Sequence, residues 1–276
     1  MPSAQSRTIF GVGAIVLFVC QAITLIGSRN LTNLMAKETA ESTEKPVGEY
    51  SIAVVELFTS EGCSSCPPAD DNLRRIANAT FKSNQKTIPL SFHVDYWNRL
   101  GWKDPFSQAA FSERQRDYAA TLNSDNVYTP QMIVNGTTEF VGSNRRLTDN
   151  ALREALKYPA KHSVTLSTKG VADNVRSTFR YHIIGLDARE DGASDYELNI
   201  AVATDLETVS VARGENGGHK LSHVWVVKSL QTLPLNSSNG IFSIDPTTVK
   251  EKHSRVVAYV QSKSTREITG AAALDL

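Results

Sequence analysis

Apolar and polar positions between residues 50 and 159 are spaced in ways that predict strands and helices in turn. Near-continuous apolar runs at 51–59 and 87–94, rich in β-branched residues, are typical of strands buried on both faces. The segments between and after these runs repeat their apolar residues with a helical period. The expected elements are, in chain order, a strand at 51–59, a helix over 68–80, a strand at 87–94, a helix at 104–122, strands at 129–136 and 138–142, and a helix at 147–159.

This order of elements predicts an α/β arrangement. A strand–helix–strand unit places its two strands parallel. Asn135-Gly136, between the two short strands, is a strong tight-turn signal and predicts an antiparallel hairpin. Pro159 ends the last helix, and Thr148 or Asp149 is the expected cap at its start.

After Pro159 the pattern changes to short β-rich runs separated by glycine, aspartate, asparagine or proline. Regular short strands with turn signals predict a small sandwich or barrel. We therefore expect two domains, an α/β domain at 49–159 and a β-rich domain at 160–276.

The N-terminal segment Ile9–Gly27 contains nineteen residues and no charge, and Arg7 and Arg29 flank it. A run of this length is sufficient for a membrane span, whereas the core of a cleaved signal peptide is usually shorter. Residues 1–28 are expected to be either a signal peptide or a membrane anchor, and the polar residues 29–48 a linker. Both alternatives place the remaining chain outside the cytoplasm, secreted or tethered, with membrane contact only through this segment.

Composition excludes one class of partner. Lysine plus arginine equals aspartate plus glutamate, at 29 each, and no basic run occurs. Nucleic-acid binding, which requires a positive field, is therefore not expected.

The chain has three cysteines, of which Cys20 lies in the N-terminal apolar run as a small apolar filler. Cys63 and Cys66 lie between a buried strand and a helix, and the thiolate of such a pair is stabilised by N–H groups at a helix start. Three interpretations remain open: a redox pair, a permanent inert disulfide, or part of a metal site. Zinc normally needs four ligands and the chain offers no second cysteine pair, whereas Cu(I) could use the two thiolates with His93.

Several strings resemble an uncharacterised family of secreted thioredoxin-like proteins over roughly residues 50 to 262. They are "VVELFTSEGCSSCPPAD", "HVDYWNRLGWKDPFS", "YTPQMIVNG" and "RGENGGHKLSHVWVVKSL". The resemblance implies an α/β thioredoxin-like domain at 49–159, followed by the β-rich domain. It also implies that Cys63 attacks, that Cys66 resolves the mixed disulfide, and that a cis Thr129–Pro130 bond lies against the pair and shapes the substrate groove. One departure is that Pro67 and Pro68 follow Cys66 directly, so regular helix is expected to begin at Pro67.

Further residues are expected at the same edge as the cysteines, because the ends of neighbouring parallel strands meet there. Trp97 is a candidate for the substrate groove, and Glu56, His93 and Asp95 are candidates for a proton relay. The alternatives are that Asp95 caps a turn, that the tryptophan fills a loop core, and that Glu56 pairs with an arginine. Two histidines of the C-terminal half, His219 and His223, lie about 13 Å apart along an expected strand, which is too far for a shared ion.

The sequence as a whole predicts an exported thiol–disulfide oxidoreductase that acts on thiol- or disulfide-containing proteins through Cys63 and Cys66. No resident metal and no cofactor are expected. Two alternatives stay open: a copper-binding metallochaperone, and a non-enzymatic module whose disulfide is structural.

Overall fold

The computed structural model describes residues 50–276 except 84–85, 125, 173–175, 187–193 and 250–252. The expected signal peptide or anchor at 1–28 and the linker at 29–48 lie outside the described residues. Within the described ranges, no helix combines the length and the apolar character needed to cross a bilayer.

The first half of the described chain has the order of elements that its apolar pattern predicts. The elements are β1 (Ala53–Thr59), α2 (Pro67–Ser83), β2 (Thr87–His93), a 3-10 turn (Asn98–Leu100), α3 (Ala109–Thr121), β3 (Gln131–Val134), β4 (Thr138–Val141) and α4 (Arg145–Ala155). β1 and β2 are parallel and β3 and β4 are antiparallel, as predicted. The predicted cap of the last helix was wrong. The helix α4 is capped by Asn144, whose side chain accepts a hydrogen bond from the Leu147 N–H, and not by Thr148 or Asp149.

The second half of the described chain consists of strands and one 3-10 turn. These are β5 (Ser163–Ala172), β6 (Arg176–Ile184), β7 (Tyr196–Thr204), β8 (Glu207–Ser210), β9 (Lys220–His223), β10 (Val226–Pro234), β11 (Asn239–Ile244), a 3-10 turn (Pro246–Val249), β12 (Ser254–Ser262) and β13 (Ile268–Asp275).

The two halves share one mixed sheet, so the expected fold class is wrong. Eight strands lie in the order β13-β12-β7-β10-β2-β1-β3-β4. The join is at Ser91 of β2, which pairs with Val226 of β10 and donates its N–H to the Trp225 carbonyl at 2.9 Å. The chain is therefore a predominantly β structure built on a continuous sheet, and not an α/β thioredoxin-like domain followed by a separate β-rich domain.

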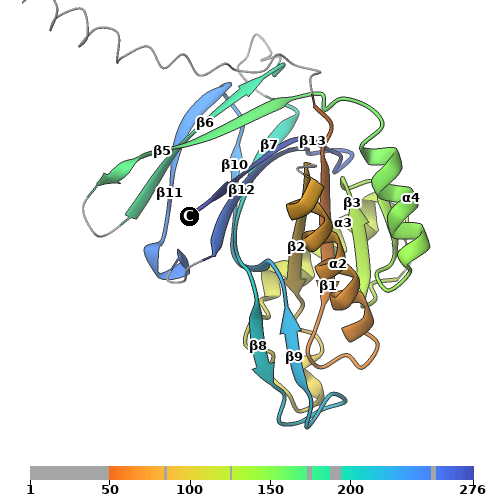
Figure 1. Cartoon of the computed structure of the whole chain (residues 1–276). Coiled ribbons are helices and arrows are strands. Elements are labelled where there is room, and N and C mark those ends of the chain that lie inside the picture. The colour runs from red at the N-terminus through yellow and green to blue at the C-terminus, as the bar shows by residue number, and fades with distance from the viewer. Residues whose placement is uncertain (1–49, 84–85, 125, 173–175, 187–193, 250–252) are drawn as a thin grey trace, which may run out of the picture. The chain divides into compact units, whose positions relative to one another are not determined.

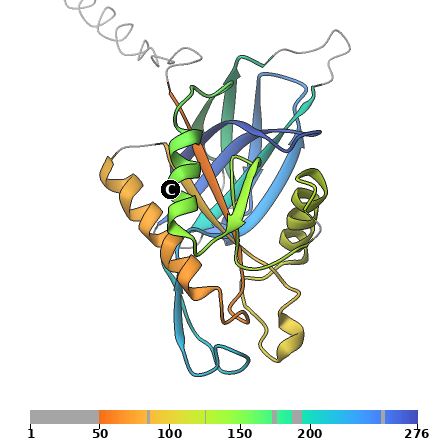
Figure 2. The same ribbon diagram turned by 90° about the vertical axis from the view of Figure 1, so that its right-hand side faces the viewer.

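Helices cover both faces of the β1 end of this sheet (Figure 2). Alternate residues of β1 face opposite sides, because side chains alternate along a strand. Val55 and Leu57 pack with α2 and α4, whereas Val54 and Phe58 pack with α3 and with apolar residues of β7 and β12. The core beneath α3 is therefore continuous from one half of the chain to the other.

At the other end of the sheet, β5, β6 and β11 form a three-stranded sheet that packs on β7 and β12 (Figure 1). The third sheet contains only β8 and β9. This pair projects beyond the end of the large sheet at which β1 finishes (Figure 1). We call residues 207–223 the arm, because its loop reaches the turn that carries the two cysteines.

Candidate functional site

Cys63 and Cys66 form a disulfide in the turn between β1 and α2. The turn is closed by backbone hydrogen bonds, from Cys63 N to Ser60 O and from Cys66 N to Cys63 O, each of 3.2 Å. Because α2 begins at Pro67, both cysteines precede the helix, as the two prolines predict. Each cysteine has 0% of its surface exposed.

A proline turn lies beside this disulfide. The Thr129–Pro130 peptide bond is cis, as the resemblance implied. The Thr129 carbonyl oxygen is 3.9 Å from Cys63 Sγ, and Trp97 Nε1 donates to Thr129 Oγ1 at 2.7 Å. The structure thus brings Trp97, Thr129 and Pro130 to the dithiol, where the sequence predicted them.

The loop of the arm covers the dithiol turn from another side. Asn216 Nδ2 donates to the carbonyl oxygens of Glu61 and Cys63, both at 2.9 Å. Glu215 Oε2 accepts the N–H of Ser64 at 3.0 Å, and the hydrogen bonds from Ser64 lower the pKa of this exposed carboxyl. The backbone around Ser64 is therefore held by residues that lie about 150 positions later in the chain.

Five titratable side chains are buried next to this turn. They form the histidine–carboxylate cluster: Glu61, Asp70, His93, Asp104 and His223. His93 Nδ1 lies 2.7 Å from Asp104 Oδ2, which also accepts the N–H of Glu61 at 2.9 Å.

His223, at the end of β9, lies between two carboxylates. Its Nε2 is 3.5 Å from Glu61 Oε1 and its Nδ1 is 3.6 Å from Asp70 Oδ2. Burial by itself lowers the pKa of His223, but Asp70 and Glu61 outweigh burial and raise the pKa to about 10. The imidazole is therefore protonated at neutral pH. Its ring centroid is 4.6 Å from that of His93.

The pairing of His93 with Asp104 also shifts a pKa. Burial raises the pKa of the Asp104 carboxyl, but the neighbouring His93 and the N–H donors of Glu61 and Phe106 bring it below its usual value. Asp104 is therefore ionised at neutral pH. The Asp104 carboxylate holds the His93 ring through its Nδ1 atom, so the Nε2 atom on the other side of the ring is available for another contact.

Two of the expected proton-relay residues lie elsewhere. Glu56 is fully buried and receives hydrogen bonds from Arg114 at 2.9 and 3.1 Å, and from Tyr118. Asp95 accepts from the hydroxyl of Ser112 on α3 at 2.5 Å. The Glu56 contact is the expected pairing with an arginine, whereas Asp95 bonds to α3 and its side chain does not cap a turn as the alternative had it. Of the three candidates, the structure places only His93 in the histidine–carboxylate cluster.

Four of the five cluster residues, and Glu215 and Asn216 of the arm, carry no clear signal in the sequence. Glu61 could have been noticed, since it lies two positions before Cys63 and Trp102 Nε1 donates to its Oε2 at 2.7 Å. His223 was dismissed because it was considered only with His219. Nothing in the sequence around His223 or Asn216 indicates that either residue contacts the chain near residue 61.

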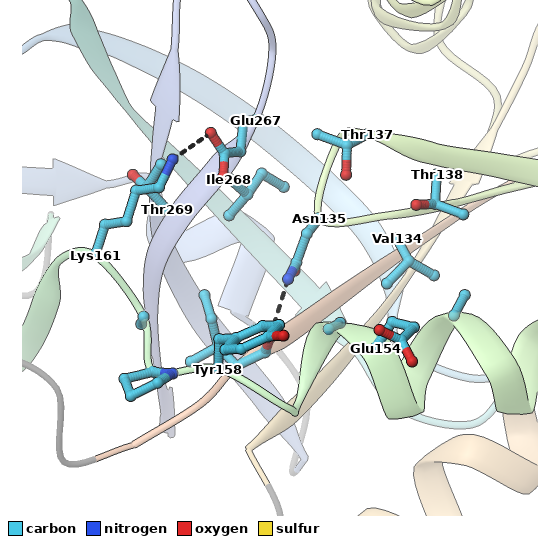
Figure 3. A pocket seen from close by; sticks show the side chains of 15 residues that line it. Val134, Asn135, Thr137, Thr138, Glu154, Tyr158, Lys161, Glu267, Ile268 and Thr269 are labelled. Atoms are coloured by element: carbon cyan, nitrogen blue, oxygen red, sulfur yellow. Dashed lines mark hydrogen bonds and ion pairs between the residues drawn. The ribbon is translucent and has the colours of Figure 1, made fainter.

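Two other kinds of site were considered, a metal centre and a ligand cavity. Within the described ranges, no three histidine, cysteine, aspartate or glutamate side chains are arranged to hold a metal ion. A cavity of about 370 Å³ lies at the opposite end of β1, near Ile52 and Tyr158, where Lys161 pairs with Glu267 at 2.7 Å (Figure 3). It is separate from the dithiol.

The family model described as "Protein of unknown function (DUF1223)" matches residues 54–261. The chain belongs to this family. The matched range contains the dithiol turn, the histidine–carboxylate cluster and the arm. An uncharacterised family is what the motifs predicted, and the family description assigns no activity.

Solved structures with the same fold include two from bacteria. A protein of Agrobacterium tumefaciens is 30% identical, with a TM-score of 0.60, over 82% of this chain and 95% of its own. HBP35 of Porphyromonas gingivalis is 18% identical, with a TM-score of 0.58, over 82% of this chain and 76% of its own, and shows similarity of fold alone. No curated protein matches the chain.

Proposed function

We propose that this protein is an exported thiol–disulfide oxidoreductase that exchanges its Cys63–Cys66 disulfide with cysteines of other proteins. The observation that carries the proposal is the burial of five titratable side chains beside a closed disulfide. Burying ionisable groups is costly, and groups with shifted pKa values, as His223 and Asp104 have here, concentrate at functional sites. An inert bridge needs no proton donors, whereas dithiol exchange consumes and releases protons.

The exchange is a pair of displacement steps. A thiolate of a partner protein attacks Cys63 Sγ, the Sγ–Sγ bond breaks, and its electron pair leaves on Cys66 as a thiolate. A second partner thiolate then attacks the partner's own sulfur in the mixed disulfide and releases Cys63. The partner dithiol loses two electrons and two protons, and the protein disulfide gains both.

The surroundings of the dithiol support this assignment. Thr129, Pro130 and Trp97 border Cys63, in an arrangement that is similar to the active sites of the thioredoxin superfamily. The uncharged N-terminal segment at 9–27 supports export, and outside the cytoplasm disulfides persist and exchange partners exist.

Access to Cys63 requires movement of the arm. With no exposed surface on either sulfur, a partner thiolate reaches Cys63 only after Asn216 and Glu215 leave the backbone of the dithiol turn. The enzyme thus alternates between a covered and an open state, and the covered state protects the disulfide from small thiols.

The test is covalent trapping in the full-length protein. Cys66→Ser leaves Cys63 as the only cysteine of the pair. Its thiolate can attack a disulfide of a partner protein, which is the reverse reaction, but Cys66 is no longer there to displace the partner from Cys63, so the mixed disulfide accumulates. We expect adducts on non-reducing gels that vanish with reductant. The matched control, Cys63→Ser, retains Cys66 and should give few. Equal adducts from both variants, or none from either, would contradict the proposal.

One observation favours a second candidate, a binding module with a structural disulfide. Complete burial of both sulfurs is also what an inert bridge would show. The reduction potential separates the two, because structural disulfides of secreted proteins have values below about −300 mV. A higher potential supports the oxidoreductase.

A further inference from the structure

The histidine–carboxylate cluster extends from the dithiol turn to the protein surface. At its outer end, Asp70 lines a cavity of about 240 Å³ between the first turns of α2 and strand β9. Lys220, Ser222 and Arg74 line the same cavity, and the Arg74 guanidinium donates to the carbonyl of Ser222, next to His223. Asp70 therefore belongs both to the buried cluster and to an opening on the solvent side.

At its inner end, the cluster adjoins both halves of the disulfide. Asp70 lies one helical turn after Cys66, and its N–H donates to the Cys66 carbonyl at 3.1 Å. The Asp70 backbone is thus tied to Cys66 across the start of α2, and its carboxylate lies on the first turn of the helix that follows this cysteine. Glu61 precedes Cys63 by two residues in the same turn.

Several buried atoms in this cluster make no contact of hydrogen-bond geometry, although His223 Nε2 and Glu61 Oε1 face each other as ion-pair partners at 3.5 Å. They are Glu61 Oε1, Asp70 Oδ1, His93 Nε2 and both ring nitrogens of His223. Buried polar groups are normally satisfied, so a concentration of unsatisfied ones needs an explanation. At 3.5 and 3.6 Å from its two carboxylates, the His223 ring is close enough to pair with either of them but is not fixed to one by a short hydrogen bond.

We propose that Asp70 and His223 carry protons between Cys66 and the cavity beside β9. This inference rests on the proposed function. It separates two routes, since the partner protein enters when the arm moves, whereas protons enter at Asp70. The sulfurs then need no direct contact with water.

The proton balance is simple. When the Cys63–Cys66 bond breaks, Cys66 leaves as a thiolate and receives a proton from Asp70, which takes one from the His223 imidazolium. His223 regains its proton from solvent through the cavity and Asp70. One proton is thus taken up from water for each Cys66 thiol formed, and oxidation reverses every step.

The charges around His223 come from all elements packed against it. Glu61 follows β1, Asp70 is on α2, and His93 with Asp104 face it from β2 and the loop beyond. On β8, Glu207 is the cross-strand partner of His223, and its carboxylate pairs with Lys228. The Arg74 guanidinium lies beside the neighbouring carbonyl. The carboxylates favour the imidazolium, in agreement with a pKa of about 10.

The test is the pH profile of disulfide reduction by dithiothreitol alone, in the full-length protein and at reductant concentrations where the rate stays linear. Rates are divided by the dithiothreitol thiolate concentration. We expect a flat wild-type profile up to about pH 10 and a fall above it, as His223 loses its proton. His223→Gln should lower the divided rate about 100-fold at neutral pH, the scale of one general acid. Added imidazole should restore part of this loss.

Controls separate proton transfer from folding. His253→Gln removes an exposed histidine outside the cluster and should leave the profile unchanged. Asp70→Asn keeps the size of the side chain but cannot carry a proton, so it should slow reduction similarly and resist rescue by imidazole. If His223→Gln does not fold, the proton route is tested by the reduction rate of Asp70→Asn and by the pH profile of the wild-type protein.

Two results would overturn the inference: a wild-type profile that shows no fall near pH 10, or a folded Asp70→Asn variant that reacts at the wild-type rate. Because dithiothreitol replaces the partner protein, both remain informative if trapping through Cys63 finds no partner. Failure of the proton route and failure of the proposed function are therefore distinguishable.

Discussion

Asn216→Ala tests whether the arm covers the dithiol. The side chain is only 7% exposed, and its amide is the donor that joins the arm to the Glu61 and Cys63 carbonyls. Alanine removes both hydrogen bonds and leaves the strands β8 and β9 intact. The substitution therefore loosens the cover without changing the cysteines.

The size of the effect follows from the two lost contacts. A hydrogen bond of this kind contributes about 1 kcal/mol net, so the covered state should lose about 2 kcal/mol relative to the open state. Since 1.4 kcal/mol corresponds to a factor of ten, the open population should rise about 30-fold. The rate of reduction should rise by the same factor where opening precedes a slower chemical step.

The assay is reduction of the native disulfide by dithiothreitol, stopped by alkylation and followed by the mass of the modified protein. Arg213→Ala is the matched control, because Arg213 is exposed on the same loop. Global stability is measured on the same samples by urea unfolding. If Asn216→Ala changes the rate of disulfide reduction by less than about threefold, the arm does not control access to the dithiol. Wild-type rates that follow global unfolding as urea is added would also contradict the cover, because access would then not arise from local opening.

Two further predictions concern stability. Arg114→Met leaves the buried Glu56 carboxylate without its charged partner, which should cost about 3–5 kcal/mol and lower Tm by about 10 °C in calorimetry. Arg116→Met, on the exposed side of the same helix, should change Tm little, and equal losses would contradict the account. The raised pKa of His223 stabilises the folded state fully below its usual value of 6.5, and this contribution should be lost as pH rises through about 10. Urea unfolding of wild type at pH 6 and pH 10.5 should show that loss, and His223→Gln should reduce it; parallel curves would argue against a charged imidazole.

Local elements were predictable because their signals are local. The apolar run at 51–59, the Asn135-Gly136 turn and the two prolines after Cys66 each determine the backbone over a few residues. The structure has a buried strand, a tight hairpin and a helix starting at Pro67 at these positions. The position of Thr129 and Pro130 beside the cysteines was implied by the family resemblance, and it follows from the antiparallel pairing of β1 with β3, in which Phe58 lies opposite Gln131.

The long-range pairing of strands could not be predicted in the same way. Any strand edge offers the same backbone donors and acceptors, so nothing in the residues of β2 indicates that β10 joins it at Ser91. The change of pattern at Pro159 is real, but it marks a change of local structure within one sheet. Inferring a separate domain from it was the error.

The histidine–carboxylate cluster was hidden for a related reason. Its members come from the dithiol turn, α2, β2, a loop and β9, and charged residues in a sequence are more often exposed than buried. His93 was found because it ends a strand next to the cysteines. His223 lies far away in the chain, so only the folded arm brings it to Glu61.

The distance along the chain between the cysteines and their cover has a consequence for biosynthesis. Asn216 follows Cys63 by 153 residues. At about 5–20 residues per second, a ribosome needs roughly 8 to 30 seconds to make that length. During this interval in each round of synthesis, the two thiols exist without their cover, and oxidants or other nascent thiols have an access that the finished molecule denies them.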